Sequence, residues 1–273
     1  MRQRTAIPGM RLTLGLTLFW LSLIVLLPLS ALFLRAASGG WEHFVSAAFS
    51  ERAIAAYRVT FGCALLAAAI NAVFGLLIAW VLVRYRFVGD RLVSALVDLP
   101  FALPTAVAGI ALTAIYADTG WVGALVAPYG IALAYKPSGI VIALVFVGLP
   151  FVVRTVEPVL ADLARDAEEA AASLGANRWQ SFRHVVLPEI LPALITGFAL
   201  AFARGVGEYG SVIFIAGNMP FQSEIAPLLI VTSLEEYDYA GATGIAVVML
   251  MVSLAVLLLI NLVQHRERVR RGL

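Results

Sequence analysis

Long apolar stretches alternate with short polar segments along this chain. A membrane-spanning helix needs about 20 consecutive, mostly apolar residues. Six stretches reach this length, and they predict an all-α membrane protein with six transmembrane helices. The first stretch is longer than the apolar region of a signal peptide and no clear cleavage site follows it, so we interpret it as a retained anchor. The predicted spans are roughly 12–34, 59–83, 95–117, 139–160, 190–215 and 242–263.

Prolines interrupt the third and fourth spans. DLPFALPTAVAG contains Pro100 and Pro104, and GLPFVVRTVEPVL contains Pro150 and Pro158. Because proline leaves backbone carbonyls unpaired and lipid cannot satisfy them, such backbone has to lie against protein or a wet cavity. Paired interruptions are typical of a translocation path, and an ordinary bundle of kinked helices is the alternative.

Basic residues are distributed unevenly among the segments between the spans. Arg and Lys favour the cytoplasmic side, and the count is thirteen against four, so both termini are predicted to be cytoplasmic. The loop 216–241 is acidic and contains neither Arg nor Lys, which agrees with a loop on the outside. The larger set is Arg2, Arg4, Arg11, Arg84, Arg86, Arg91, Arg165, Arg178, Arg183, Arg266, Arg268, Arg270 and Arg271, and the smaller set is Arg35, Arg52, Arg58 and Lys136.

The composition agrees with a membrane protein in contact with lipid. The chain is 62% hydrophobic and 13% charged, with a mean hydropathy of +0.94, whereas a soluble domain has about a quarter of its residues charged. A net charge of +2 gives no reason to expect nucleic acid as a partner. The single cysteine, Cys63, excludes an internal disulfide, and its apolar surroundings predict a buried thiol. The three histidines show no ligand spacing, so we expect no metal and no cofactor.

Two patterns bear on nucleotide binding. Gly205, Gly207 and Gly210 spell G-x-G-x-x-G, but no strand precedes them, so we expect these glycines to permit close helix packing. The one lysine, Lys136, is followed by proline. A phosphate-binding loop that ends in Gly-Lys-Ser/Thr is therefore absent from the chain, and we do not expect it to hydrolyse ATP.

The longest predicted cytoplasmic loop, 161–188, is predicted to form a helix–glycine–helix hairpin. EEAAASLG favours a helix that ends at Gly175, and a second short helix follows until Pro188 stops it. Trp179 and Phe182 are three residues apart, so they share one face of that second helix. Such a hairpin suits docking into a groove on another protein. An amphipathic loop on the lipid surface is the alternative.

This hairpin carries a family signature. Glu169-Ala170-Ala171, then Gly175, then Leu187-Pro188 resemble the E-A-A-x3-G-x9-I-x-L-P motif of bacterial ABC importer permeases, with Val185 at the isoleucine position. The resemblance implies the type I ABC importer permease fold, in which this segment forms coupling helices that dock onto a cytoplasmic ATPase subunit. It places ATP hydrolysis in that partner. The residues assigned to coupling are Glu169, Ala170, Ala171, Gly175, Arg178, Leu187 and Pro188.

Further segments resemble the T-type permease subunits of sulfate and thiosulfate ABC importers. They are DLPFALPTAVAG, PFVVRTVEPVL, ASLGANRWQSF, VVLPEILPAL and RGVGEYGSVIFIAGN. The resemblance implies a dimer of cytoplasmic ATP-binding subunits, a related W-type second permease and a periplasmic sulfate/thiosulfate-binding protein as partners. It also implies a location in the bacterial inner membrane. We expect a first segment over 1–58, a transporter domain over 59–263 and a basic tail over 264–273.

Four charged residues lie within predicted spans, and each pair has helical spacing. Arg204 and Glu208 are four apart, with Arg204 near mid-span, and Arg154 and Glu157 are three apart, nearer the cytoplasmic end. Because charges are costly in a bilayer, they should face the bundle interior. Either the pairs fix helix packing, or the arginines lend positive potential to the path of a dianion. The path candidates are Arg154, Glu157, Arg204, Glu208, Pro104 and Thr105, with Ser211 and Asn218 as further donors.

The favoured function is that of a permease subunit that imports sulfate and thiosulfate by alternating access, with ATP hydrolysed in the partner. Molybdate or tungstate import is the alternative within this class, because those permeases carry a similar G-E-[FY]-G stretch. A proton-coupled secondary transporter with Glu157, Glu208 and the arginines as a relay is an alternative of another class. A membrane scaffold without transport activity is a third.

Overall fold

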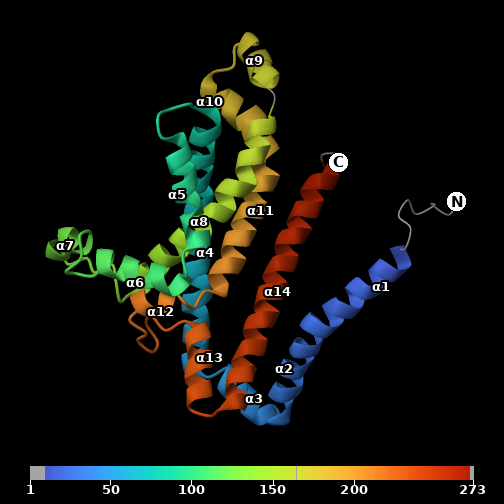
Figure 1. The fold of residues 1–273 in the computed structure, drawn as a ribbon, viewed down its shortest axis with the longest axis vertical. Coiled ribbons are helices and arrows are strands. Elements are labelled where there is room, and N and C mark those ends of the chain that lie inside the picture. Colours follow the sequence, from blue (N-terminus) through green and yellow to red (C-terminus); the bar gives the residue numbers. More distant parts are fainter. Residues whose placement is uncertain (1–9, 164, 271–273) are drawn as a thin grey trace. The chain divides into compact units, whose positions relative to one another are not determined.

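The computed structural model describes residues 10–163 and 165–270, with side chains described except at 11, 165 and 263–270. Within these ranges the regular structure is helical and contains no strand (Figure 1). The predicted orientation depends in part on Arg2, Arg4 and Arg271, which lie outside the described residues. Of the predicted basic tail, residues 264–270 are described only as helical backbone and 271–273 not at all. The orientation and the segment boundaries therefore stay predictions.

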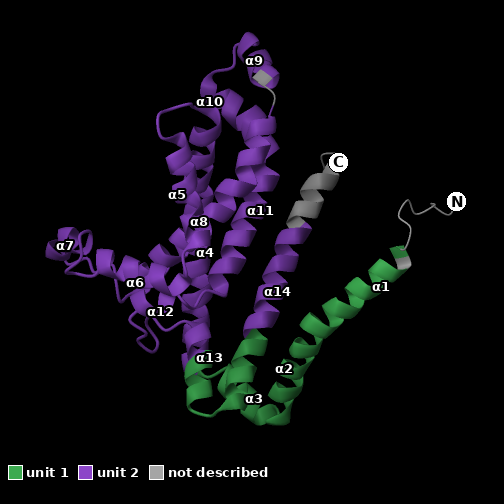
Figure 2. Cartoon of the chain, viewed as in Figure 1, with its two compact units in different colours: residues 1–50, 230–248 green, residues 51–229, 249–273 purple. Residues whose placement is uncertain are grey.

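The chain divides into two compact units (Figure 2), Met1–Ser50 with Ile230–Val248 and Glu51–Leu229 with Met249–Leu273. In the first unit, α1 (Met10–Leu21), a π-helical turn η1 (Ser22–Leu26) and α2 (Leu27–Ser38) follow one another without a gap. The stretch Leu12–Ser38 is long and apolar enough to cross a membrane and contains the predicted first span. α3 (Trp41–Ala48) follows it.

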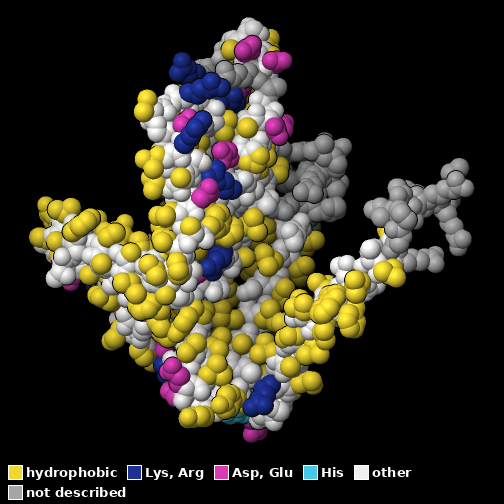
Figure 3. All heavy atoms as spheres, in the orientation of Figure 1, with side chains coloured by type: hydrophobic (Ala, Val, Ile, Leu, Met, Phe, Trp, Pro, Cys, Tyr) yellow, Lys and Arg dark blue, Asp and Glu magenta, His cyan; other side chains and the backbone are white. Residues whose placement is uncertain are grey.

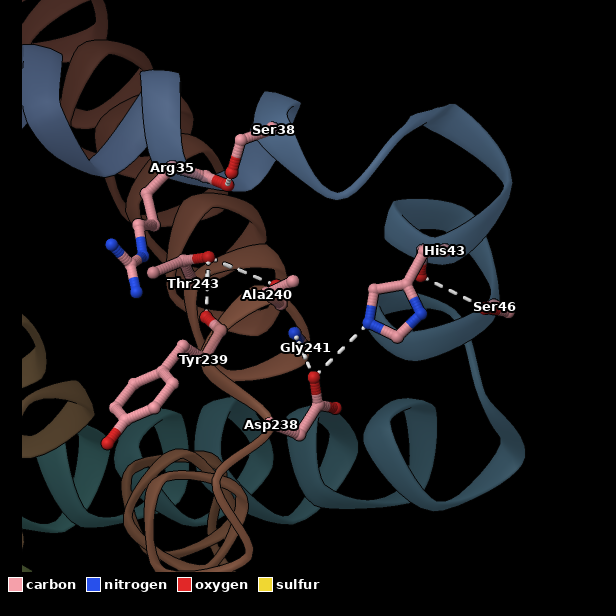
Figure 4. Close-up of polar contacts among 9 residues, drawn as sticks. All are labelled: Arg35, Ser38, His43, Ser46, Asp238, Tyr239, Ala240, Gly241 and Thr243. Atoms are coloured by element: carbon pink, nitrogen blue, oxygen red, sulfur yellow. Dashed lines mark hydrogen bonds and ion pairs between the residues drawn. The ribbon is translucent and has the colours of Figure 1, made fainter.

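Polar contacts join the elements of the first unit where α14 (Tyr239–Arg270) begins (Figure 4). Asp238 Oδ1 accepts a hydrogen bond of 2.8 Å from the Gly241 N–H and so caps α14. The same oxygen lies 3.2 Å from Nε2 of His43 on α3. The guanidinium carbon of Arg35 on α2 lies 5.5 Å from the ring centroid of Tyr239. Both α2 and α3 are therefore attached to the first turn of α14.

In the second unit, the core forms where α4 (Glu51–Arg84), α8 (Pro137–Asp162) and α11 (Leu187–Val206) pack against one another. Glycines permit the close approach of these helices. A Cβ added at Gly75 on α4 would lie 2.8 Å from Cγ1 of Val152 on α8, and one at Gly197 on α11 would lie 2.9 Å from the Val152 Cα. The predicted buried thiol is confirmed, since Cys63 is 8% exposed.

The predicted third span is a sharply bent pair of helices. The chain bends by 115° between α5 (Asp90–Ala102) and α6 (Thr105–Tyr116). Pro104 is the N-cap of α6 and Leu103 is extended, so the predicted interruption is confirmed at Pro104. Pro100 lies inside α5 and does not interrupt it. α6 runs away from α8 toward α7 (Gly123–Val126), which is followed by η2 (Ala127–Tyr129) (Figure 1). Within the described residues, five helices are long and apolar enough to cross a membrane, or six if this pair is one span.

The predicted interruption of the fourth span is wrong. α8 runs without a break from Pro137 to Asp162, with Pro150 and Pro158 inside it. Pro150 is buried among neighbouring helices. At Pro150, packing against these helices holds α8 together although proline removes a backbone hydrogen bond, as is common for prolines in membrane helices.

The predicted fifth span has different limits in the structure. α11 ends at Val206, and a turn separates it from the short α12 (Val212–Ile215), so the predicted helix over 190–215 is broken. At its other end α11 continues backward through the π-helical η3 (Phe182–Val186) into α10 (Arg178–Ser181), giving a span over Arg178–Val206. α9 (Arg165–Ser173) and α13 (Ala226–Glu235) complete the order of elements.

Candidate functional site

The predicted hairpin is present as α9, a turn at Gly175, and α10. Gly175 has φ +87°, a left-handed conformation that costs glycine little. The Ala176 N–H donates to the Ala171 carbonyl and the Gly175 N–H to the Ala172 carbonyl, both at 3.0 Å, as in a Schellman motif. Asn177 and Gln180 then form a capping box that starts α10. Local sequence therefore determines the turn, and the prediction of Gly175 as a C-cap glycine is confirmed.

The aromatic residues of the hairpin rest on the end of α4. Trp179 and Phe182 stack with ring centroids 5.6 Å apart, which confirms that they share a face. Phe182 also meets the Trp80 ring of α4 edge-on at 5.6 Å. Arg84 lies over that ring at 5.4 Å and donates from Nη2 to Glu168 Oε1 on α9. Sequence reasoning missed this anchoring, which joins residues 84 positions apart.

The hairpin exposes large apolar side chains on its surface. A cavity of about 560 Å³ opens beside it. Glu169 and Arg178 line this cavity, together with Trp80 and Arg84 of α4. Leu174 is 88% exposed and Trp179 66% exposed. Large apolar side chains that are exposed together often mark an interaction site. The hairpin thus presents charged and apolar groups that a partner protein could bury.

The sequence predicted that Pro188 ends the second helix of the hairpin, and this prediction is wrong. The helix passes through Pro188, because the preceding η3 turn is π-helical and the Leu187 N–H donates to the Phe182 carbonyl five residues back. Pro188 is the second residue of α11, and the π-helical turn before it accommodates a residue without an N–H. Leu187 and Pro188 therefore belong to the spanning helix, while Ala170 and Ala171 lie on α9.

Arg204 and Glu208 form the predicted ion pair, with Arg204 Nη1 2.6 Å from Glu208 Oε2. Glu208 is 2% exposed, and its Oε1 accepts 2.9 Å hydrogen bonds from both the N–H and the hydroxyl of Ser211. Glu208 thereby closes the turn after α11. The placement of Arg204 near mid-span is wrong, because α11 ends two residues later. A third of the Arg204 side chain stays exposed.

The first turn of α6 lies against this Glu208 turn. A Cβ added at Gly210 would lie 2.2 Å from Oγ1 of Thr105, and one at Gly109 would lie 2.8 Å from the Ser211 Cα. The structure thus brings Pro104 and Thr105 together with the segment that holds Glu208. The predicted packing role of the glycines applies to Gly210. At Gly205 an added Cβ would make an ordinary contact of 3.4 Å with the Ala64 Cβ.

Gly207 does not share that role. Within the described residues, a Cβ added at Gly207 would meet only the Ala203 carbonyl oxygen, at 4.0 Å.

The two further donors that the sequence suggested for the anion path are engaged within the protein. Asn218 donates from Nδ2 to the Ile213 carbonyl at 2.9 Å. The Ser211 hydroxyl is likewise engaged with Glu208.

Arg154 lies in a different cluster, between α8 and α5. Its Nε and Nη2 donate to the two carboxylate oxygens of Asp98 at 2.7 and 2.5 Å. Nη1 donates to the predicted partner Glu157 at 2.5 Å, and Nη2 also bonds the Ser94 carbonyl and hydroxyl at 2.9 Å. The whole guanidinium is engaged, which favours a packing role over contact with an anion. The sequence did not lead us to predict Asp98 as a partner of Arg154. The one indication of its importance is its position as an acidic residue beside an apolar, proline-containing stretch.

In the part of the chain whose side chains are described, no group of three or more His, Cys, Asp and Glu residues could hold a metal ion.

A further ion pair lies near the start of α4, at the end opposite Arg84. Arg52 donates from Nε and Nη2 to the carboxylate of Glu224 at 2.8 and 2.7 Å, and Glu224 is 3% exposed.

Residues 71–269 match the family described as binding-protein-dependent transport system inner membrane component. The chain belongs to this family. It is 49% identical over 263 residues to the sulfate transport system permease protein CysT of Escherichia coli, covering 96% of this chain and 95% of the relative. It is 51% identical over 254 residues to a probable sulfate transport system permease protein of Nephroselmis olivacea, covering 93% and 89%.

The fold agrees with this membership. A crystal structure of a bacterial ABC transporter involved in alginate import matches with a TM-score of 0.77 at 19% identity, over 94% of this chain and 95% of that one. At this identity the likeness shows the fold alone. Together with the family match, it confirms the predicted ABC importer permease fold and the membrane location.

Proposed function

We propose that this chain is the permease subunit of an ATP-driven importer that carries sulfate, and also thiosulfate, across the bacterial inner membrane. One observation carries the proposal. Relatives named as sulfate transport permeases share about half of their residues with this chain over more than nine-tenths of its length.

The energy for transport would come from a dimer of ATP-binding subunits docked on the hairpin. The chain has no Gly-Lys-Ser/Thr loop of its own. The coupling residues would be Glu169, Ala170, Ala171, Gly175, Arg178, Leu187 and Pro188, with Leu187 and Pro188 linking the hairpin to α11. The exposed Trp179 and Leu174 support docking at this surface. A second permease of the W type would complete the path, and a periplasmic binding protein would deliver the anion.

Arg204 and the first turn of α6 would line the anion path. The first N–H groups of a helix are unpaired and carry partial positive charge, which favours an anion nearby. Thr105 begins α6, and Pro104 precedes it. Arg204 is partly neutralised by Glu208, so the site would bind weakly and release its substrate easily. We assign Arg154 and Glu157 to helix packing, because Asp98 and Ser94 occupy the remaining donors of Arg154.

The proposed orientation places the hairpin in the cytoplasm. In Figure 3, Lys and Arg side chains gather over the α5 and α10 end of the second unit, and hydrophobic side chains cover much of the surface of its spanning helices. Basic side chains favour the cytoplasmic side of a membrane, which supports a cytoplasmic hairpin.

Uptake of radiolabelled sulfate in a strain that lacks this chain tests the proposal. The wild-type chain should restore uptake, excess unlabelled thiosulfate should compete, and molybdate should compete poorly. Uptake that survives loss of the ATP-binding subunit would contradict the proposal and favour a proton-coupled transporter. Dominant competition by molybdate would assign a different oxyanion.

Docking is tested in the same strain by Glu169→Lys. The reversed charge should abolish uptake while the protein stays in the membrane, because it spoils contact with the ATP-binding subunit. Asp166→Lys reverses an exposed charge on the same short helix and should keep most of the uptake. Wild-type uptake by Glu169→Lys would refute the docking role of this residue.

A further inference from the structure

One end of α4 is fixed to the hairpin by two contacts on the same helical face. Trp80 and Arg84 are four residues apart, so their side chains lie one above the other. Arg84 pairs with Glu168 of α9, and Trp80 meets Phe182 just after α10. Both arms of the hairpin therefore touch the last turn of α4.

The Arg84–Glu168 pair is better shielded than a typical surface pair. The Arg84 side chain is 12% exposed and that of Glu168 29% exposed. Exposed pairs contribute little because water and ions screen them, whereas charge-assisted hydrogen bonds under partial burial are considerably stronger. The Trp80 ring covers one face of the guanidinium and adds a cation–π attraction.

The opposite end of α4 is fixed to the first residue of α13 and to the residues just before it. Arg52 makes its bidentate pair with Glu224, and the hydroxyl of Thr60 accepts a 2.8 Å hydrogen bond from the N–H of Ala226. α4 has 34 residues, which corresponds to about 50 Å at 1.5 Å per residue. One continuous helix thus connects the hairpin with a loop at the far end of the same unit.

We propose that the Arg84–Glu168 pair, seated on Trp80, is a positioning contact that makes α4 move together with the hairpin. Through this pair, the movements that accompany the nucleotide cycle of the ATP-binding subunits are transmitted to residues 224–226 at the far end of α4. This inference rests on the proposed docking of those subunits at the hairpin. It assigns to Arg84, Glu168 and Trp80 a role in transmitting motion.

The test follows the far end of α4 in the assembled transporter. Cys63→Ala removes the one cysteine of the chain, and Glu51→Cys introduces an exposed thiol at the first residue of α4. The rate of maleimide labelling is measured with and without trapped ATP. With the native pair, nucleotide should change this rate at least about fivefold, the lower end of typical couplings between sites.

Arg84→Glu and Glu168→Arg should each reduce that change below about twofold, and the two substitutions combined should restore it, because the pair reforms with reversed polarity. Arg86→Glu is the matched control, since it reverses an exposed charge two residues away and should leave the response intact. Co-purification of the ATP-binding subunits is measured for every variant. If a charge reversal prevents assembly, the milder Arg84→Gln and Glu168→Gln replace it.

Three results would overturn the inference: an unchanged nucleotide response in the single variants, no recovery in the swapped pair, or loss of ATP-binding subunits in the Gln variants as well. The last result would make the pair an assembly contact. Labelling needs no transported substrate, so failure of the wild type to import sulfate would count against the proposed substrate alone. Failure of the wild type to bind ATP-binding subunits would count against the proposed docking.

Discussion

Arg154 on α8 and Asp98 on α5 form a bidentate ion pair that joins residues 56 positions apart in the sequence. α5 leads into the bend at Pro104, and α8 belongs to the three-helix core of the second unit. The pair therefore attaches the bent segment to the core. Its geometry, with two parallel N–H donors on one carboxylate, is the strongest arrangement available to arginine.

Asp98→Ala should destabilise the transporter, because it leaves the Arg154 guanidinium short of acceptors. Because both side chains are partly exposed and water screens the pair, we expect a loss of about 1 kcal/mol and a fall of the thermal midpoint of a few degrees. Thermal unfolding of the purified complex measures the fall. Asp118→Ala removes an exposed acid from a loop and should leave the midpoint unchanged. An equal effect of both substitutions would contradict the attachment.

Arg204→Ala should lower sulfate uptake at least about tenfold while the complex remains assembled, because hydrogen bonds to a charged group contribute about 1.5–3 kcal/mol. Arg204→Lys keeps the positive charge and should retain a larger share of the activity. Arg58→Ala removes an exposed charge from α4 and is the control. Normal uptake by assembled Arg204→Ala would leave the arginine with a packing role only.

Gly210→Ala should impair transport, because the added methyl group would lie 2.2 Å from the hydroxyl oxygen of Thr105. Combination with Thr105→Ala removes that oxygen and should recover part of the uptake if Thr105 acts chiefly through packing. Gly207→Ala, in the same turn, meets no such neighbour among the described residues and should be tolerated. Uptake rates and membrane levels of the variants decide the matter, and equal defects at both glycines would argue against a steric cause.

Gly175→Ala should weaken the hairpin, because φ +87° costs an L-residue roughly 1–2 kcal/mol. Gly175→Asn should be milder, since asparagine adopts left-handed conformations more readily than alanine. Retention of ATP-binding subunits on the purified permease provides the measurement. The order Gly, Asn, Ala in retention is expected, and equal retention by all three would show that the turn tolerates other conformations.

The sequence by itself determined the helical spans, the bend at Pro104, the turn at Gly175 and the local pair of Arg204 with Glu208. These depend on apolar length, on proline and glycine stereochemistry, and on helical spacing, all of which act between residues close in the chain. Only the tertiary structure showed that Arg154 pairs with Asp98 and that Arg84 pairs with Glu168. It also decided that α8 continues through Pro150 and that α11 ends at Val206. Those features depend on which side chains from distant segments meet and bury one another, and no local pattern contains that information.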